Sequence, residues 1–261
     1  MPPRILVLCD LEGAAAVVDF KLQTYADARY YDQAKRLATL EINALVDGIL
    51  DTGPAQVVVL DGHGPGGVDY EALHRDARMM VGRPLPLPWI DASYEAQFLY
   101  GHHAMNHVAT GVLCHSWSST SISNCWLNGA LIGEIGMNCA LASEVGVPTV
   151  FISGDDATIE EGKRYVPEVV GVSVKEGLSR TSAISLSPLK ARDLMREGGR
   201  LAMAKIDQVT RYSPAPPYTF RTEYIAAESA DARAKKPGVE QVSSHAVEVK
   251  AESLLEIMQQ R

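Results

Sequence analysis

The stretch "ILVLCDLEG" (residues 5–13) is an apolar run that ends in two carboxylates, Asp10 and Glu12. Such a run, stopped abruptly by polar residues, is typical of a strand buried on both faces of a sheet. "QVVVLDGHG" (residues 56–64) repeats the pattern and ends in Asp61 and His63. A helical pattern over residues 28–50 separates the two runs. Strand, helix and strand in this order predict a parallel sheet with flanking helices.

The same alternation continues along the chain. Further strands are expected over residues 77–82, 97–101, 110–116 and 148–156, and helices over 134–143, from 158 and from 187. Asn128-Gly129 between two apolar runs predicts a hairpin. The fold class is therefore α/β, a mainly parallel sheet with flanking helices plus a smaller α+β C-terminal portion. A proline-rich stretch at 214–217 divides the expected domains into 1–213 and 214–261, with one continuous domain as the alternative.

Composition excludes several classes of partner. The 261 residues are 46% hydrophobic and 21% charged, carry a formal net charge of -8, and show no cluster of Lys and Arg. Nucleic acids and anionic membranes both require concentrated positive charge. No apolar stretch approaches the roughly 18 residues of a membrane span, and no signal peptide is recognisable. We expect a cytoplasmic protein whose four cysteines are reduced.

Histidines and carboxylates gather where the predicted strands end, which is where open α/β sheets place functional groups. Besides the acids and His63 already named, the candidates are His102, His103 and His107 after the strand at 97–101, His115 near the end of 110–116, Glu134 at the start of the next helix, and Asp155 and Asp156 at the end of 148–156. Imidazole and carboxylate are ligands for zinc and similar cations, and several carboxylates favour two ions. Each residue also has a simpler interpretation: loop polarity, turn formation or, for Glu134, a favourable charge at a helix N-terminus.

Other motifs carry less weight. "SPLK" (residues 187–190) matches the S-x-x-K pattern of acyl enzymes, but Ser187 and Pro188 also form an ideal helix start. No G-x-S-x-G motif accompanies the serines near His115, and "GHGPGG" (62–67) lacks the residues of a phosphate loop. Serine hydrolase and nucleotide-binding functions are therefore not favoured.

Five motifs in order resemble a known family: "DLEG", "LDGHG", "GHHA", "GVLCHS" and "NGALIGEIGMN". They are similar to those of the DppA-type D-aminopeptidase family, the M55 zinc metallopeptidases. The resemblance extends to about residue 190 and is thinner in the last quarter of the chain. It implies two zinc ions per chain and the roles of six residues. The implied ligands are Asp10 (bridging), Glu12, His63, His103 and Glu134, and the implied catalytic residue is His115.

Two positions depart from the family pattern: Leu8 stands where the family signature has serine, and His102 precedes the implied ligand His103. Neither removes a ligand, so the departures bear on substrate preference. Asn138, one turn after Glu134, is a candidate for substrate binding, although a plain helix-surface asparagine is the simpler interpretation. The resemblance also implies homo-oligomers that form rings, with a decamer as one size.

The sequence thus predicts a dinuclear zinc aminopeptidase that removes the N-terminal residue of short peptides or aminoacyl amides, with selectivity for D-residues left open. One alternative is a zinc amidohydrolase acting on another small amide or lactam. Others are a mononuclear iron oxygenase and a non-catalytic, metal-containing peptide-binding protein.

Overall fold

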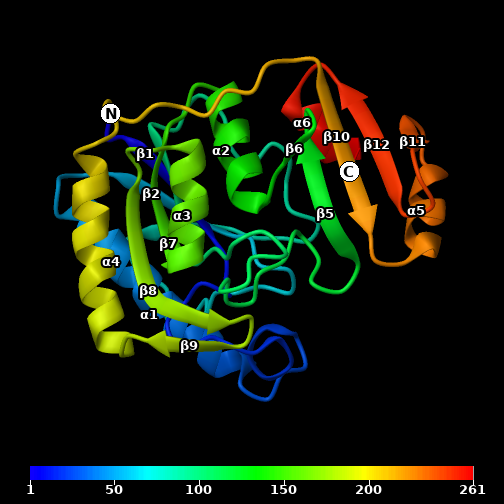
Figure 1. Ribbon diagram of the computed structural model, residues 1–261. Coiled ribbons are helices and arrows are strands. Elements are labelled where there is room, and N and C mark those ends of the chain that lie inside the picture. Colours follow the sequence, from blue (N-terminus) through cyan, green and yellow to red (C-terminus); the bar gives the residue numbers. More distant parts are fainter. Residues whose placement is uncertain (261) are drawn as a thin grey trace.

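The structure is a computed structural model that describes residues 1–260. Two sheets organise this part of the chain (Figure 1). From edge to edge, the larger sheet contains β3 (Ala77–Met80), β2 (Gln56–Asp61), β1 (Arg4–Cys9), β4 (Ala96–Tyr100), β7 (Thr149–Asp155), β8 (Val170–Ser179) and β9 (Ser182–Ser185). The smaller sheet contains β11 (Val239–Gln241), β12 (Ala246–Ala251), β10 (Tyr218–Tyr224), β5 (Ile122–Leu127) and β6 (Ala130–Leu131).

Helices cover both faces of the larger sheet and one end of the smaller one. They are α1 (Tyr31–Leu50), α2 (Glu134–Glu144), α3 (Asp156–Tyr165), α4 (Pro188–Met203), α5 (Ala227–Ala234) and α6 (Leu254–Gln260), with a π-helical turn η1 over Phe20–Thr24. All pairings within the larger sheet are parallel except that of β9 with β8. The predicted α/β class, a mainly parallel sheet with flanking helices, is confirmed.

Strand β1 lies inside the larger sheet and is buried on both faces. Ile5 and Val7 belong to an apolar core that also contains buried residues of α1 and α4. Leu6 and Leu8, on the opposite face, belong to a second core with residues of α2, α3, the smaller sheet and α6. This two-sided burial explains why the run at residues 5–9 is apolar without alternation.

Two local structures predicted from short sequence motifs, a helix start and a hairpin, are present in the structure. Ser187 caps α4 by accepting a hydrogen bond from the Lys190 amide at 3.3 Å, and Pro188 is the first helical residue. The S-x-x-K pattern is thus accounted for by a helix start. Asn128 and Gly129 form the β5–β6 hairpin with φ angles of 50° and 81°, as a type I′ turn requires.

The expected strand over residues 110–116 is wrong, because the segment is a loop of turns. Its apolar residues are buried, but the amides of Val112 and Leu113 bond the Asp155 carboxylate and the Arg180 carbonyl instead of a neighbouring strand. Leu113 also has a φ of 52°, which a strand does not permit.

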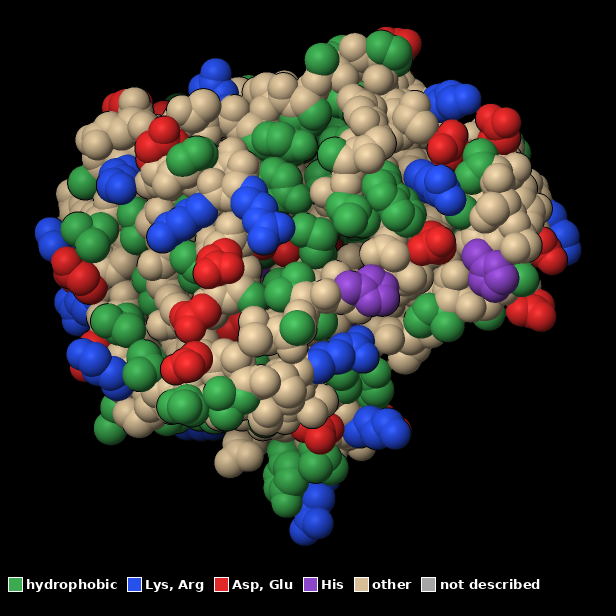
Figure 2. Space-filling view, viewed as in Figure 1, with side chains coloured by type: hydrophobic (Ala, Val, Ile, Leu, Met, Phe, Trp, Pro, Cys, Tyr) green, Lys and Arg blue, Asp and Glu red, His purple; other side chains and the backbone are tan. Residues whose placement is uncertain are grey.

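Residues beyond 213 form β10, β11 and β12 with α5 and α6, and β10 pairs with β5 from earlier in the chain. A domain boundary at residue 213 stays a prediction. All four cysteines are free and buried. None of the described helices is long and apolar enough to cross a membrane. Acidic and basic side chains are interspersed over the face seen in Figure 2, which carries no basic patch.

Candidate metal centre

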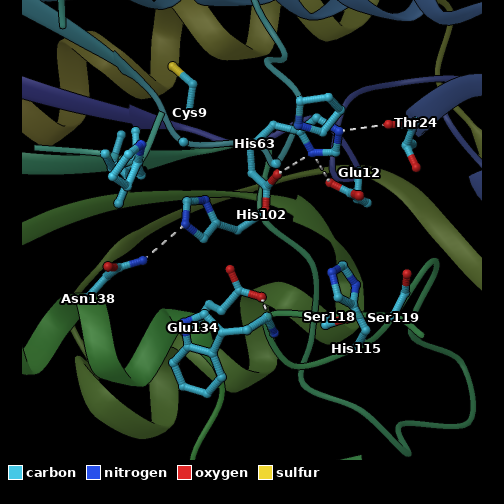
Figure 3. Close-up of a pocket in the computed structure, with 18 of the residues that line it drawn as sticks. Cys9, Glu12, Thr24, His63, His102, His115, Ser118, Ser119, Glu134 and Asn138 are labelled. Carbon is cyan, nitrogen blue, oxygen red and sulfur yellow. Dashed lines mark hydrogen bonds and ion pairs between the residues drawn. The ribbon is translucent and has the colours of Figure 1, made fainter. Parts of the chain in front are cut away.

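Three neighbouring strands of the larger sheet bring the candidate ligands together. The sheet order β2-β1-β4 places the carboxyl ends of these strands side by side. Asp10 and Glu12 follow β1, His63 follows β2, and His103 follows β4. Glu134 is the first residue of α2, which packs in the second apolar core, and its side chain points to these strand ends. All of these residues except His103 line a cavity of about 560 Å³ (Figure 3).

The ligand atoms form two groups joined by one carboxylate. Asp10, Glu12 and His63 make up the first group, and His103, His115 and Glu134 the second; within each group the ligand atoms lie within 4.8 Å of one another. Asp10 Oδ1 lies 3.1 Å from His63 Nδ1, whereas its Oδ2 lies 3.4 Å from His103 Nε2. The two oxygens of Asp10 therefore face different groups, as in a bridging carboxylate.

Two further carboxylates complete the groups. Glu12 Oε2 lies 3.1 Å from His63 Nδ1, and Glu134 Oε1 lies 3.4 Å from His103 Nε2. The amide of Trp117 donates a 2.7 Å hydrogen bond to the same oxygen of Glu134 and fixes its position. The N-terminus of α2 also favours negative charge at Glu134.

Backbone carbonyls fix the tautomers of the three histidines in these groups. In each ring, one nitrogen contacts a backbone carbonyl oxygen. Because a carbonyl oxygen only accepts hydrogen bonds, this nitrogen carries the proton. The contacts are His63 Nε2 to Thr24 at 2.8 Å, His103 Nδ1 to Ala104 at 3.0 Å and His115 Nδ1 to Leu113 at 2.9 Å. The other ring nitrogens, Nδ1 of His63 and Nε2 of His103 and His115, are the ones available to a metal ion, which is the usual arrangement in metal sites.

Two buried ligand atoms, Glu12 Oε2 and His103 Nε2, have only the ion-pair contacts given above and no hydrogen bond among the described residues. Both side chains are almost fully buried, with 3% of each residue exposed. A buried polar atom without a partner is costly unless another group satisfies it. Nitrogen and carboxylate oxygen donors at this spacing fit a divalent cation such as zinc.

The charges of these side chains also indicate a site for cations. Burial alone would raise the pKa of Asp10, but His103 and His63 outweigh it and hold this pKa well below its usual value. Burial also opposes ionisation of Glu134, whose pKa His103 lowers to about 2. The carboxylates in turn raise the pKa values of His63 and His103 far above the usual value, against burial. The cluster requires positive charge, as protons on imidazole or as bound cations.

His115 stands beside the centre in a position that suits two roles. Its ring stacks on that of His103 with centroids 3.8 Å apart and an interplanar angle of 15°. Burial, and then the charge of His103, lower its pKa. It lines the cavity and is 8% exposed. Geometry alone therefore permits His115 to be a ligand of the second group or a neutral imidazole that contacts substrate.

The other residues singled out in the sequence also line the cavity. His102 donates from Nδ1 to the Tyr100 carbonyl at 3.2 Å, and its Nε2 lies 3.5 Å from Asn138 Nδ2. Figure 3 shows Asn138 and His102 on one side of Glu134 and His115 on the other. Leu8 forms part of the cavity lining next to Cys9 and Asp10.

Three polar residues at strand ends do not enter the centre. Asp61 accepts hydrogen bonds from the Gly67 amide at 2.8 Å and the Tyr70 hydroxyl at 3.0 Å, so it shapes the loop that carries His63. Asp155 caps α3 through the Thr158 amide. His107 is exposed and contacts Ser123.

No sequence pattern predicts the buried lysine that holds the loop of Glu12. Lys175, from β8, is 2% exposed and donates to the carbonyls of Glu12 (2.5 Å), Ala14 (2.9 Å) and Val17 (2.6 Å). Glu41, from α1, accepts a hydrogen bond from the Ala15 amide in the same loop at 3.0 Å. Both partners are far away in sequence, and only the fold shows them to be anchors.

Replacing Lys175 with methionine should lower the free energy of unfolding by about 2 kcal/mol or more, because three buried carbonyls lose their donor. Urea unfolding of the metal-free protein measures this change. Lys205→Met is the matched control, since Lys205 donates only one such bond, to the Glu168 carbonyl at 3.1 Å. Equal stability of the two variants would show that Lys175 does not anchor the loop.

Carboxylates and imidazoles from four segments, grouped at the strand ends around a cavity, define this chain as an α/β protein with a candidate two-cation centre. A family model described as D-aminopeptidase (Peptidase_M55) matches residues 3–260. The chain therefore belongs to the D-aminopeptidase family, a family of hydrolases. The family resemblance drawn from the five sequence motifs is confirmed, and the match includes the C-terminal quarter as well.

Individual relatives agree with the family. The D-aminopeptidase of Bacillus subtilis (strain 168) is 26% identical over 263 residues, which cover 98% of this chain and 94% of the relative. A solved structure described as "Zn-dependent D-aminopeptidase DppA from Bacillus subtilis, a self-compartmentalizing protease" superposes with a TM-score of 0.93 at 25% identity. The superposition covers 98% of this chain and 94% of that chain.

Proposed function

We propose that the chain is a dinuclear zinc-dependent aminopeptidase that hydrolyses the N-terminal residue of short peptides or aminoacyl amides, with a preference for D-residues. The observation that carries the proposal is the position of Asp10 between the two ligand groups: one of its oxygens faces His63 and the other faces His103. Membership of the D-aminopeptidase family supports the reaction, and the zinc dependence of the Bacillus subtilis relative supports the metal.

Each cation would be held by three side chains, with Asp10 shared between the two ions. Asp10, Glu12 and His63 would hold the first ion, and Asp10, His103 and Glu134 the second. The Trp117 amide and the Lys175 ammonium group keep the two glutamate segments in place. Zinc, when bound, supplies Lewis acidity and makes a water more acidic.

The protein's own acid–base group would be His115. Its Nδ1 proton is held by the Leu113 carbonyl, so Nε2 is the nitrogen that can accept a proton from the attacking water and deliver it to the leaving amine. Asn138 lines the same cavity and would donate a hydrogen bond to the substrate. With these two assignments, His115 would transfer the proton and Asn138 would orient the substrate.

We further infer a homo-oligomer, because the Bacillus subtilis relative is described as self-compartmentalizing. A ring, for example a decamer, would restrict entry to short peptides. Leu178, Ile184 and Leu189 are 56%, 61% and 70% exposed, and such apolar side chains are common where subunits meet. The expected location is the cytoplasm.

A panel of D- and L-aminoacyl amides and dipeptides, assayed with and without a chelator, tests the proposed reaction. We expect release of the N-terminal residue from D-substrates, loss of this release with chelator, and recovery with zinc. Metal analysis should give two zinc ions per chain. Turnover of a lactam or another small amide alone would favour the amidohydrolase, and one iron with oxygen dependence would favour an oxygenase. No chelator-sensitive turnover of any substrate would contradict the proposal.

A further inference from the structure

One side of the cavity is apolar. We call this side the apolar wall and define it by five residues that line the cavity: Leu8, Leu85, Trp89, Trp117 and Met258. They come from β1, the loop before β4, the loop after His115, and α6. All five belong to, or pack against, the second apolar core. The wall is therefore continuous with the interior and not a set of isolated surface side chains.

The apolar wall leaves apolar surface uncovered at the cavity. Leu8 and Trp89 are 5% and 8% exposed, whereas Leu85, Trp117 and Met258 are only partly buried. The three partly buried residues come from separate segments, and each borders the same cavity. An apolar group that enters the cavity would cover this surface and displace water, which is favourable.

The wall begins at the candidate metal centre itself. Leu8 lies two residues before Asp10, and both residues line the cavity. A Cβ atom added to Gly62 would lie 2.8 Å from Leu8 Cδ1, which places Leu8 against the loop of His63. Trp117 contacts Glu134 through its amide at 2.7 Å. A substrate held at the centre therefore lies within reach of the wall.

The rest of the lining offers no counter-charge for an acidic side chain. Hydroxyl groups line another part of the cavity, among them those of Tyr25, Ser118 and Ser119, and Figure 3 shows both serines beside His115. Among the described residues that line the cavity, none is Lys or Arg. The charged groups there are the carboxylates and histidines of the centre. An acidic substrate side chain would find no counter-charge outside the metal ions.

We propose that the apolar wall is the subsite for the side chain of the substrate's N-terminal residue, and that the substrates are amides of bulky apolar amino acids. This inference rests on the proposed function. A cavity of about 560 Å³ is within the size range of small-molecule sites and accommodates a residue of the size of leucine or phenylalanine. Alanine leaves most of the wall uncovered, and aspartate brings a charge against it.

The test compares p-nitroanilides of D-alanine, D-leucine, D-phenylalanine and D-aspartate with the zinc-loaded enzyme. We expect kcat/KM for leucine and phenylalanine to exceed that for alanine by about tenfold or more, the range that apolar pockets provide. Leu85→Asp should lower kcat/KM for phenylalanine about tenfold and leave that for alanine within about twofold. Met258→Ala should produce a smaller change in the same direction.

Val81→Asp is the matched control, because Val81 lies in the same loop, is 47% exposed and does not line the cavity. Circular dichroism and zinc content show whether each variant is folded and loaded. Turnover that favours alanine, or that Leu85→Asp and Met258→Ala leave unchanged across the panel, would overturn the subsite. Absence of turnover on every amide would instead contradict the proposed function, so the two failures are distinguishable.

Discussion

Replacing Asp10 with alanine is expected to remove both metal ions from the protein and to abolish hydrolysis. The two oxygens of this carboxylate face different histidines, His63 at 3.1 Å and His103 at 3.4 Å. Of the proposed ligands, its loss would leave one carboxylate and one histidine for each ion, too few for tight binding. We expect the zinc content after dialysis to fall from two ions per chain to nearly none. Metal analysis of the purified variant measures this directly.

Asp155→Asn is the matched control for this experiment. Asp155 is also a buried carboxylate that ends a strand of the larger sheet, but it caps α3 and does not belong to either ligand group. This variant should retain its zinc. Asp10→Asn keeps the shape of the side chain and distinguishes loss of ligation from loss of the fold. If Asp10→Ala retained two ions, Asp10 would not be the bridge; if it retained one, the groups would bind independently.

The position of the candidate ligands could be predicted because they depend on short-range patterns. The apolar runs at residues 5–9 and 56–60 identify buried parallel strands, and the residues after such strands meet at one edge. Asp10 and His63 are therefore neighbours as a direct consequence of the fold. Glu134 could be placed at the start of a helix for the same kind of reason, since Asn128-Gly129 fixes the hairpin before it.

Features that depend on contacts between distant segments could not be predicted. Lys175 bonds Glu12 across 163 positions of sequence, and neither residue has a local signal that reveals the pair. The loop at 110–116 has the composition of a strand, but Asp155 and Arg180 take its amide groups. In both cases a side chain or carbonyl from elsewhere decides the local structure, and composition contains no information about it.

Leu8 shows how the structure changes the meaning of one residue. In the sequence it is a departure from the serine of the family signature and has no function of its own. In the structure it lies against Gly62 and belongs to both the second apolar core and the lining of the cavity that Asp10 also lines. The replacement of serine by Leu8 therefore adds to the apolar wall beside the candidate metal centre. This wall is the proposed subsite for the substrate side chain.

Replacing His115 with alanine should separate its two permitted roles. As an acid–base group, His115 would be needed for turnover and not for metal binding. The variant should then keep two zinc ions per chain while kcat falls by about 10²–10⁴, the usual contribution of such a group. Zinc content and turnover of the best aminoacyl amide, measured on the same sample, give both quantities.

His107→Asn is the control, because His107 lies in the same segment but is exposed and outside the centre, and asparagine tolerates its φ of 67°. Its activity and zinc content should remain those of the unmodified protein. A His115→Ala variant with only one zinc ion would make His115 a ligand of the second group, which its position beside His103 and Glu134 also permits. Two ions with full activity would remove His115 from the chemistry, and the proton would then have to be transferred by a carboxylate of the centre.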